Sequence, residues 1–208
     1  MAKWNMSLLC LVDSSRKPEF ESLHETLWSA LDFYGMAYEV VDLAESRLSP
    51  EVLRSHSVIV IGQEHLGESL LEHDTEAVVD AVNEGVGLVC FDGDLHQYKQ
   101  PLKDAFGLKT TEEPTHMPHL NTAAVRIWEK KHFITAAKEL ELVRFDKPVE
   151  VGNVVNIEKD HSLLMVAANS SGTPALVAET YGRGKAVLFA LSMKVWLREY
   201  FGHGGGLD

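Results

Sequence analysis

Short apolar runs alternate with longer stretches of helical spacing through the first hundred residues of the chain. Each run has the length of a strand and is apolar on both faces, which is typical of buried parallel strands. The runs are SLLCLV (7–12), AYEVVDL (37–43), SVIVIG (57–62) and GLVCF (87–91). Amphipathic helices between them would cover the sheet. The alternation therefore predicts an α/β protein with a doubly wound, mostly parallel sheet and helices on both faces.

Three helices are predicted between these runs. Apolar residues recur every three or four positions from Phe20 to Tyr34, and Gly35 then provides a natural stop. A short helix is expected to begin after Ser49, because the proline at position 50 suits a first helical turn. A further helix carries apolar residues around Val78 and closes at Gly85.

The pattern changes after Gly107. A polar, proline-bearing loop (110–121) is followed by short strands and turns. The expected strands are AAVRIW (123–128), LELVRF (140–145), VEVGNVV (149–155), SLLMVAA (162–168), ALVAETY (175–181) and KAVLFAL (185–191). Gly182 and Gly184 predict a hairpin turn between the last two. The second half is thus expected to carry an antiparallel excursion before the chain rejoins the sheet.

Composition narrows the classes of protein. The 208 residues are 45% hydrophobic and 24% charged, which fits a single globular domain over 1–208. A net charge of −12 without a basic cluster argues against nucleic acid, and no apolar run is long enough to span a membrane. Two cysteines in apolar runs fit reduced thiols, so a cytoplasmic protein is expected. The glycine-rich end (202–206) suggests a fragment of a longer protein.

Three segments carry a resemblance to a known superfamily: VGLVCFDGD, HFITAAKEL and PALVAETYGRGKAVLFAL. The chain resembles the class I glutamine amidotransferase-like superfamily from about Ser7 to Leu191. It is most similar to the non-amidotransferase branch around trehalose-utilisation-type proteins and the middle domains of some glycosidases. His132–Thr135 and Gly182–Lys185 match segments that recur in that branch. The resemblance implies a flavodoxin-like fold and a link to carbohydrate metabolism.

Cys90 departs from the catalytic pattern of that superfamily. The resemblance implies a nucleophilic cysteine at a Gly-x-Cys-x-Gly elbow, but Cys90 precedes the turn and stands between Val89 and Phe91. The histidine–carboxylate partner is also missing, since His203 is followed by glycines. Cys90 is therefore expected to be a buried wall residue with a raised pKa. No catalytic residue is assigned.

Polar residues follow three of the predicted strands, at the edge where open parallel sheets bind ligands. The candidate ligand-binding residues are Asp13, Ser14, Glu64, His65, Asp92, Asp94 and His96, with Ser15 and Gln63 beside them. They would suit a hydroxyl-rich ligand or a divalent metal. The alternative is that the aspartates only cap loops and helices. No phosphate-binding fingerprint is present, and no cofactor is expected.

Two further features admit two interpretations each. His116 and His119 have a spacing compatible with metal binding, but a solvated loop is the simpler interpretation. The glycines at 202–206 could bind an anion, although a linker is favoured.

Two functions remain open from the sequence. One is a non-catalytic pseudoenzyme domain that binds a ligand or other domains of a parent protein. The other is a small hydrolase that uses Glu64, Asp92, Asp94 and His96, with or without a metal. The sequence is also compatible with a homodimer.

Overall fold

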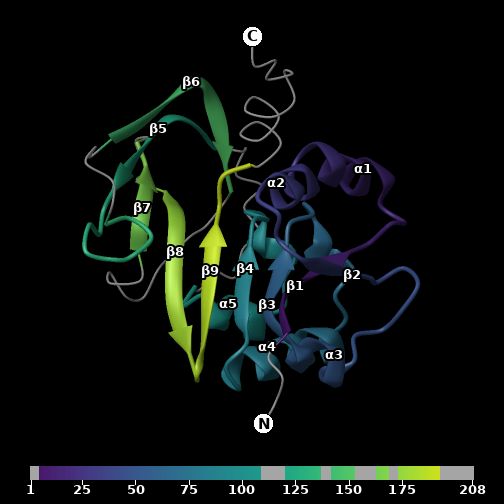
Figure 1. The fold of residues 1–208 in the computed structure, drawn as a ribbon. Coiled ribbons are helices and arrows are strands. Elements are labelled where there is room, and N and C mark those ends of the chain that lie inside the picture. Colours follow the sequence, from purple (N-terminus) through teal and green to yellow (C-terminus); the bar gives the residue numbers. More distant parts are fainter. Residues whose placement is uncertain (1–4, 109–119, 137–141, 153–162, 169–172, 193–208) are drawn as a thin grey trace.

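A nine-stranded sheet organises the protein, in the order β2-β1-β3-β4-β9-β8-β7-β5-β6 (Figure 1). The computed structural model describes residues 5–108, 120–136, 142–152, 163–168 and 173–192. The parallel strands are β1 (Asn5–Val12), β2 (Tyr38–Asp42), β3 (His56–Ile61), β4 (Gly87–Cys90) and β9 (Gly184–Phe189). All five lie where the apolar runs predicted strands. The α/β class and the mostly parallel first half are confirmed.

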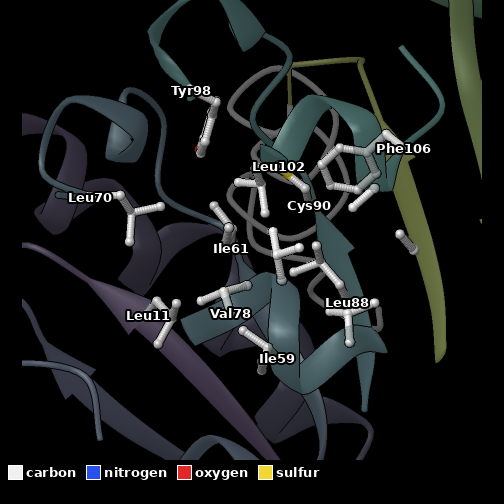
Figure 2. Packing of buried hydrophobic residues seen from close by; sticks show 14 of the residues in the cluster. Leu11, Ile59, Ile61, Leu70, Val78, Leu88, Cys90, Tyr98, Leu102 and Phe106 are labelled. Atoms are coloured by element: carbon white, nitrogen blue, oxygen red, sulfur yellow. The ribbon is translucent and has the colours of Figure 1, made fainter. Parts of the chain in front are cut away.

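Helices cover both faces of the parallel strands. They are α1 (Lys17–Glu25), α2 (Leu27–Phe33), α3 (Pro50–Ser55), α4 (Glu72–Asn83) and α5 (Gln100–Ala105), with short 3-10 turns η1 (Leu66–Glu68) and η2 (Leu95–Gln97). On one face, Leu23 of α1 and Leu27 of α2 pack with Cys10. On the other face, Val78 of α4 packs in the cluster that holds Cys90 (Figure 2). The alternation of side chains along each strand therefore places the two thiols on opposite faces.

The predicted helix from Phe20 to Tyr34 is wrong as a single element. The chain breaks at Thr26, whose φ of −123° and ψ of −97° lie outside the helical region. The Thr26 hydroxyl donates to the Ser22 carbonyl oxygen at 2.8 Å, so α1 and α2 are separate helices. Threonine competes for backbone partners in this way, and helical spacing alone did not reveal the break. The predicted stop is confirmed, because Gly35 adopts a φ of +63°.

The second half is antiparallel, as predicted. Its strands are β5 (Leu120–Ile127), β6 (Leu142–Val151), β7 (Leu163–Ala167) and β8 (Pro174–Tyr181), and β8 pairs antiparallel with β9. The hairpin turn between β8 and β9 is confirmed, with Gly182 at φ +58°. The separate strands predicted at 140–145 and 149–155 are wrong, because one continuous strand β6 spans Pro148. β6 is an outer strand of the sheet order, where a missing N–H is tolerated.

The antiparallel part curls until β6 reaches the end of β9. Val151 forms an antiparallel bridge with Leu191, and the N–H of Gly152 donates to the Ala190 carbonyl oxygen at 2.6 Å. The Ser192 N–H donates in turn to the Glu150 carbonyl oxygen at 2.9 Å. A separate apolar cluster fills the curl: Val125, Val149, Val151, Ala167, Ala175 and Leu191. The β6 end is thereby held above the carboxyl ends of β4 and β9.

Candidate functional site

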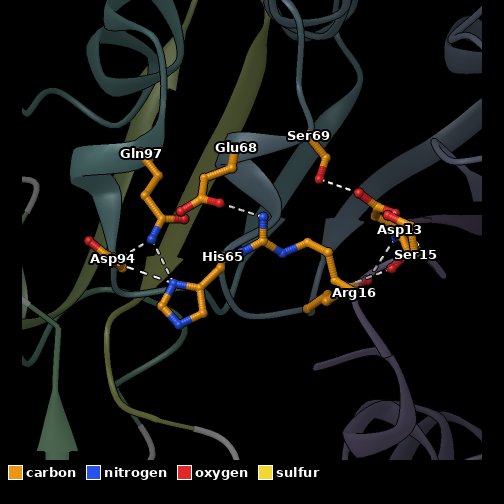
Figure 3. A network of polar contacts seen from close by, with 9 residues as sticks. Asp13, Ser15, Arg16, His65, Glu68, Ser69, Asp94 and Gln97 are labelled. Carbon is orange, nitrogen blue, oxygen red and sulfur yellow. Dashed lines mark hydrogen bonds and ion pairs between the residues drawn. The ribbon is translucent and has the colours of Figure 1, made fainter. Parts of the chain in front are cut away.

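The polar residues expected at the carboxyl ends of β1, β3 and β4 follow neighbouring strands of the sheet. Figure 3 shows four of them: Asp13, Ser15, His65 and Asp94. Parallel neighbours place the segments that follow these strands at one edge of the sheet. The residues form separate hydrogen-bonded groups rather than one cluster.

Gln63 joins the ends of β1 and β3. The Asp13 N–H donates to Gln63 Oε1 at 2.8 Å, and Gln63 Nε2 donates to the Asp13 carbonyl oxygen at 3.0 Å. Gln63 is fully buried, and both the oxygen and the nitrogen of its side-chain amide bond to the backbone of Asp13. Its role is to hold the edge in place rather than to meet a ligand.

The Asp13 side chain caps its own loop. Its carboxylate accepts from the N–H of Ser15 at 2.9 Å and from the hydroxyls of Ser15 and Ser69. Burial acts to raise the pKa of this carboxyl, but those donors together hold it below the ordinary value. The neighbouring Ser14 donates its N–H to the Asp42 carboxylate at 3.0 Å, away from the other groups. The capping interpretation fits Asp13.

His65, Asp94 and Gln97 form a group open to solvent. Gln97 Nε2 lies 2.6 Å from His65 Nδ1 and donates to Asp94 Oδ2 at 2.7 Å, and His65 Nδ1 lies 3.5 Å from the same carboxylate oxygen. The side chains of His65 and Asp94 are 33% and 29% exposed. His65 has a φ of +63°, a left-handed conformation that costs about 1 kcal/mol outside glycine and recurs at functional sites. These three residues are the part of the edge most able to contact a ligand.

Asp92 is removed from that surface. It is 1% exposed, accepts from the Tyr98 hydroxyl at 2.8 Å, and accepts from the Asp94 N–H at 3.0 Å. Burial raises the pKa of its carboxyl to about 7, although the Tyr98 hydrogen bond opposes the shift. Asp92 is therefore a poor candidate for direct ligand contact.

Glu64 and His96 lie at the borders of the edge. Glu64 Oε1 accepts from the Ser192 hydroxyl at 3.0 Å, which joins the loop after β3 to the end of β9. His96 is partly buried, and its Nε2 atom has no hydrogen-bond partner among the described residues.

Charge at this edge is predominantly negative. Arg16 contributes a positive charge to this edge, and its guanidinium Nη1 lies 2.5 Å from Glu68 Oε2. Asp13, Glu64 and Asp94 add further carboxylates to the edge. Such a field disfavours anionic ligands such as phosphates and favours neutral, hydroxyl-rich ones.

Position 93, in the turn after β4, has no room for a side chain. A β-carbon on Gly93 would lie 2.8 Å from the Ala190 carbonyl oxygen and 2.8 Å from Gly152 Cα. Both neighbours are backbone atoms, one of them in the β6 end described above. Position 93 is therefore closed off by main-chain atoms.

Cys90 is a wall residue, as predicted. It is fully buried, and burial raises the pKa of its thiol well above the ordinary value. Cys10 is equally buried, and burial raises the pKa of its thiol to about 12. We expect both thiols to resist Ellman's reagent in the native protein at mildly alkaline pH and to react only as fast as the protein opens. Absorbance at the thiolate product's wavelength measures this rate.

Denatured protein is the positive control for that measurement, because both thiols should then react within the mixing time. Rapid labelling of one thiol in native protein would contradict the buried-wall assignment.

Several residues of the edge were missed from sequence. Arg16, Glu68, Ser69, Gln97 and Tyr98 supply partners to the residues that were chosen, and each lies within a few positions of one of them. Gln97 was detectable in principle, because it stands three residues after Asp94 at the start of a turn. Ser69 and Ser192 reach the edge only through the fold.

The remaining sequence predictions concern the C-terminal glycines, further histidines, metal sites and membrane spans. His116, His119, His203 and the glycines at 202–206 lie outside the described residues. Within the described ranges, no three His, Cys, Asp or Glu side chains are placed so as to hold a metal ion. In those same ranges no helix is long and apolar enough to cross a membrane.

Comparisons with known proteins find likeness in structure and none in sequence. No family model matches the chain, and no curated protein matches it. A cytoplasmic protein from Salmonella typhimurium LT2 has a TM-score of 0.64 at 17% identity, over 89% of this chain and 87% of that one. A ThuA-like protein from Bacteroides uniformis has a TM-score of 0.63 at 12% identity, over 92% of this chain and 84% of that one.

A larger enzyme contains the same arrangement as one part. A GH42 β-galactosidase from G. stearothermophilus has a TM-score of 0.57 at 14% identity, over 96% of this chain. The chain spans only 29% of that enzyme's length. At these identities the likeness establishes the fold alone.

Proposed function

We propose that the chain is a non-catalytic, amidotransferase-like domain that binds a neutral, hydroxyl-rich ligand within a carbohydrate-active protein. The observation that carries the proposal is the filled turn after β4. Gly93 packs against the backbone of Gly152 and Ala190, and Cys90 lies fully buried below it. A nucleophile elbow needs an exposed nucleophilic side chain at that turn, but position 93 has no room for one and the Cys90 thiol is buried before it.

The fold assignment is part of the proposal. The parallel strands follow the order β2-β1-β3-β4-β9, which corresponds to the flavodoxin-like order of a doubly wound sheet. The ligand would lie at the same edge, against His65, Asp94 and Gln97, whose imidazole, carboxylate and amide can pair with adjacent hydroxyls. Structures of a ThuA-like protein and of a β-galactosidase share the fold of this chain, which supports the carbohydrate context.

The proposed domain is one part of a longer chain. It corresponds to about 30% of several β-galactosidase chains, so the same edge or its surroundings would also contact other domains of the parent protein. Contact between domains and ligand binding are compatible at an edge of this kind, because ligand sites are frequent at domain interfaces.

A thermal-shift panel tests the proposal. Galactose, glucose, trehalose, AMP and magnesium chloride would each be added to the purified chain, and the melting temperature measured. We expect a neutral sugar to raise the melting temperature, and AMP to leave it unchanged because the edge is acidic. His65→Ala and Asp94→Ala should each abolish the sugar-dependent rise.

Asp80→Ala provides the matched control, because Asp80 is an exposed carboxylate on α4. It should keep the rise. A rise that survives both edge variants would place the ligand elsewhere, and no rise with any sugar would contradict the proposed ligand class. Asp92→Ala is unsuitable as an edge variant, since it would leave the buried Tyr98 hydroxyl without its acceptor.

The hydrolase alternative keeps one specific observation in its favour. His65 and Asp94 form an imidazole–carboxylate pair at 3.5 Å with both side chains partly exposed. Turnover of nitrophenyl glycosides or esters that is lost in His65→Ala would establish it in place of the binding role.

A further inference from the structure

Exposed aromatic rings stand on the loop that follows β5, outside the groups of polar residues described above. Trp128 is 54% exposed and Phe133 is 72% exposed. The loop leaves the sheet beside β7, where the backbone N–H of Trp128 donates to the Leu164 carbonyl oxygen at 2.8 Å (Figure 1). Aromatic side chains are enriched in binding interfaces relative to the rest of the protein surface.

The loop that carries the rings is firmly built. Thr135 is fully buried, and its hydroxyl donates to the carbonyl oxygens of Glu129 and His132. The N–H groups of Thr135 and Ala136 both donate to the His132 carbonyl oxygen, at 2.9 and 2.8 Å. A pre-organised loop loses little conformational entropy on binding, so its exposed rings are suited to contact a ligand.

Polar groups of both signs flank the rings. Lys185 Nζ lies 5.6 Å from the centroid of the Phe133 ring, and the His132 ring is tilted by 37° against Phe133 with centroids 4.5 Å apart. On the same loop the Glu129 carboxylate accepts a hydrogen bond from the backbone N–H of Lys131 at 2.6 Å. Aromatic faces beside hydroxyl-binding charges match a sugar ring, which has an apolar C–H face and polar hydroxyls at its rim.

The area available argues against a protein partner at this place. Two aromatic side chains supply roughly 300–500 Å² of contact surface. A stable protein interface needs about 800 Å² on each side. The charged residues Glu129, Lys130 and Lys131 stand between the two aromatic residues in the loop. An extended saccharide fits this size and alternation better than a folded domain or a second copy.

We propose that the loop 128–136, together with Lys185, is a stacking platform for an oligosaccharide. The inference rests on the ligand class of the proposed function but concerns a second place on the molecule. Lys185 stands at the start of β9, whereas Ser192 of the first site follows its end. Lys185 and Ser192 lie seven positions apart along the chain, at opposite ends of β9, which corresponds to about 20 Å of extended chain.

Isothermal titration with defined tetrasaccharides tests the platform. β-1,4-Galactotetraose, cellotetraose and maltotetraose would be titrated into the purified chain and into a Trp128→Ala/Phe133→Ala variant. We expect at least one tetrasaccharide to bind, and the double variant to bind it at least roughly tenfold more weakly with an unchanged melting temperature. Trp128→Phe/Phe133→Tyr keeps both rings and should restore binding.

Phe33→Ala is the matched control, because Phe33 is 71% exposed on α2. It should bind the tetrasaccharide as the wild type does. Equal binding by the double variant, or no binding of any tetrasaccharide by the wild type, would overturn the platform. Self-association that the double variant abolishes in sedimentation would also overturn it, by showing that the rings meet another copy.

The two proposals fail in different ways. If a tetrasaccharide binding signal is lost in His65→Ala and retained in Trp128→Ala/Phe133→Ala, the proposed function stands and the platform is wrong. If the signal is lost in Trp128→Ala/Phe133→Ala and retained in His65→Ala, the platform stands and the ligand does not use the carboxyl edge.

Discussion

Asp92→Asn is expected to be more stable than the wild type above neutral pH and to lose that advantage in acid. The Asp92 carboxyl is 1% exposed, and its burial raises the pKa to about 7 from an ordinary value near 3.8. An acid whose pKa is higher in the folded state holds its proton more tightly when folded. Its contribution to the free energy of unfolding is full below the unfolded pKa and is lost as the pH rises towards 7.

A shift of this size corresponds to about 4 kcal/mol between roughly pH 4 and pH 8. Asparagine keeps the shape and carries no charge, so the difference between variant and wild type should grow with pH by about that amount. Urea denaturation of both proteins at several pH values measures it. Stability curves that stay parallel from acid to alkaline pH would contradict a buried, titrating Asp92.

Two variants check the sign and the cause of this effect. Asp13→Asn should show the opposite trend, because serine donors lower the pKa of Asp13 and its contribution is lost as the pH falls. Tyr98→Phe removes the hydroxyl that donates to Asp92 at 2.8 Å. The pKa of Asp92 should then rise further, and the loss of stability should move to higher pH.

The order of elements was readable from sequence because strands and helices have different hydrophobic periods. Apolar runs such as 57–62 placed the buried strands, and Gly35 and Gly182 marked turns that need a positive φ. The local features that interrupt or extend an element could not be predicted from the sequence. Thr26 ends a helix by bonding to Ser22, and β6 runs through Pro148 because an outer strand tolerates proline.

The candidate site was predicted as a place but not as an arrangement. Asp94 and His65 meet because the segments after β3 and β4 are neighbours, which a parallel sheet implies. Whether an aspartate lies on the surface or below it depends on partners distant in sequence or on the opposite side of a turn. Asp92 is covered by Tyr98, and Asp13 is bound by Ser69, so identical residue types took different roles.

Curling of the antiparallel part decides what the carboxyl edge can do. In a doubly wound sheet the space above the central strands is where a ligand reaches the chemistry. Here the β6 end enters that space, and the N–H of Gly152 bonds to the Ala190 carbonyl oxygen. The segment thereby closes the turn after β4 and leaves the loops after β3 and β4 as the accessible part.

Gly152→Ala is expected to be the most damaging small substitution at this edge. A β-carbon there would lie 2.3 Å from the Gly93 carbonyl oxygen and 2.4 Å from Gly93 Cα, and backbone atoms cannot move aside as a side chain can. Either β6 must leave β9 or the turn after β4 must shift. We expect a loss of about 3 kcal/mol in the free energy of unfolding, measured by urea denaturation.

Gly35→Ala separates crowding from the general effect of replacing glycine. A β-carbon on Gly35 meets nothing within 4 Å, and the φ of +63° alone should cost about 1 kcal/mol. If Gly152→Ala costs no more than this control, the β6 end is not held against Gly93 in solution. Position 93 could then carry a side chain, and the filled-turn argument against catalysis would fail.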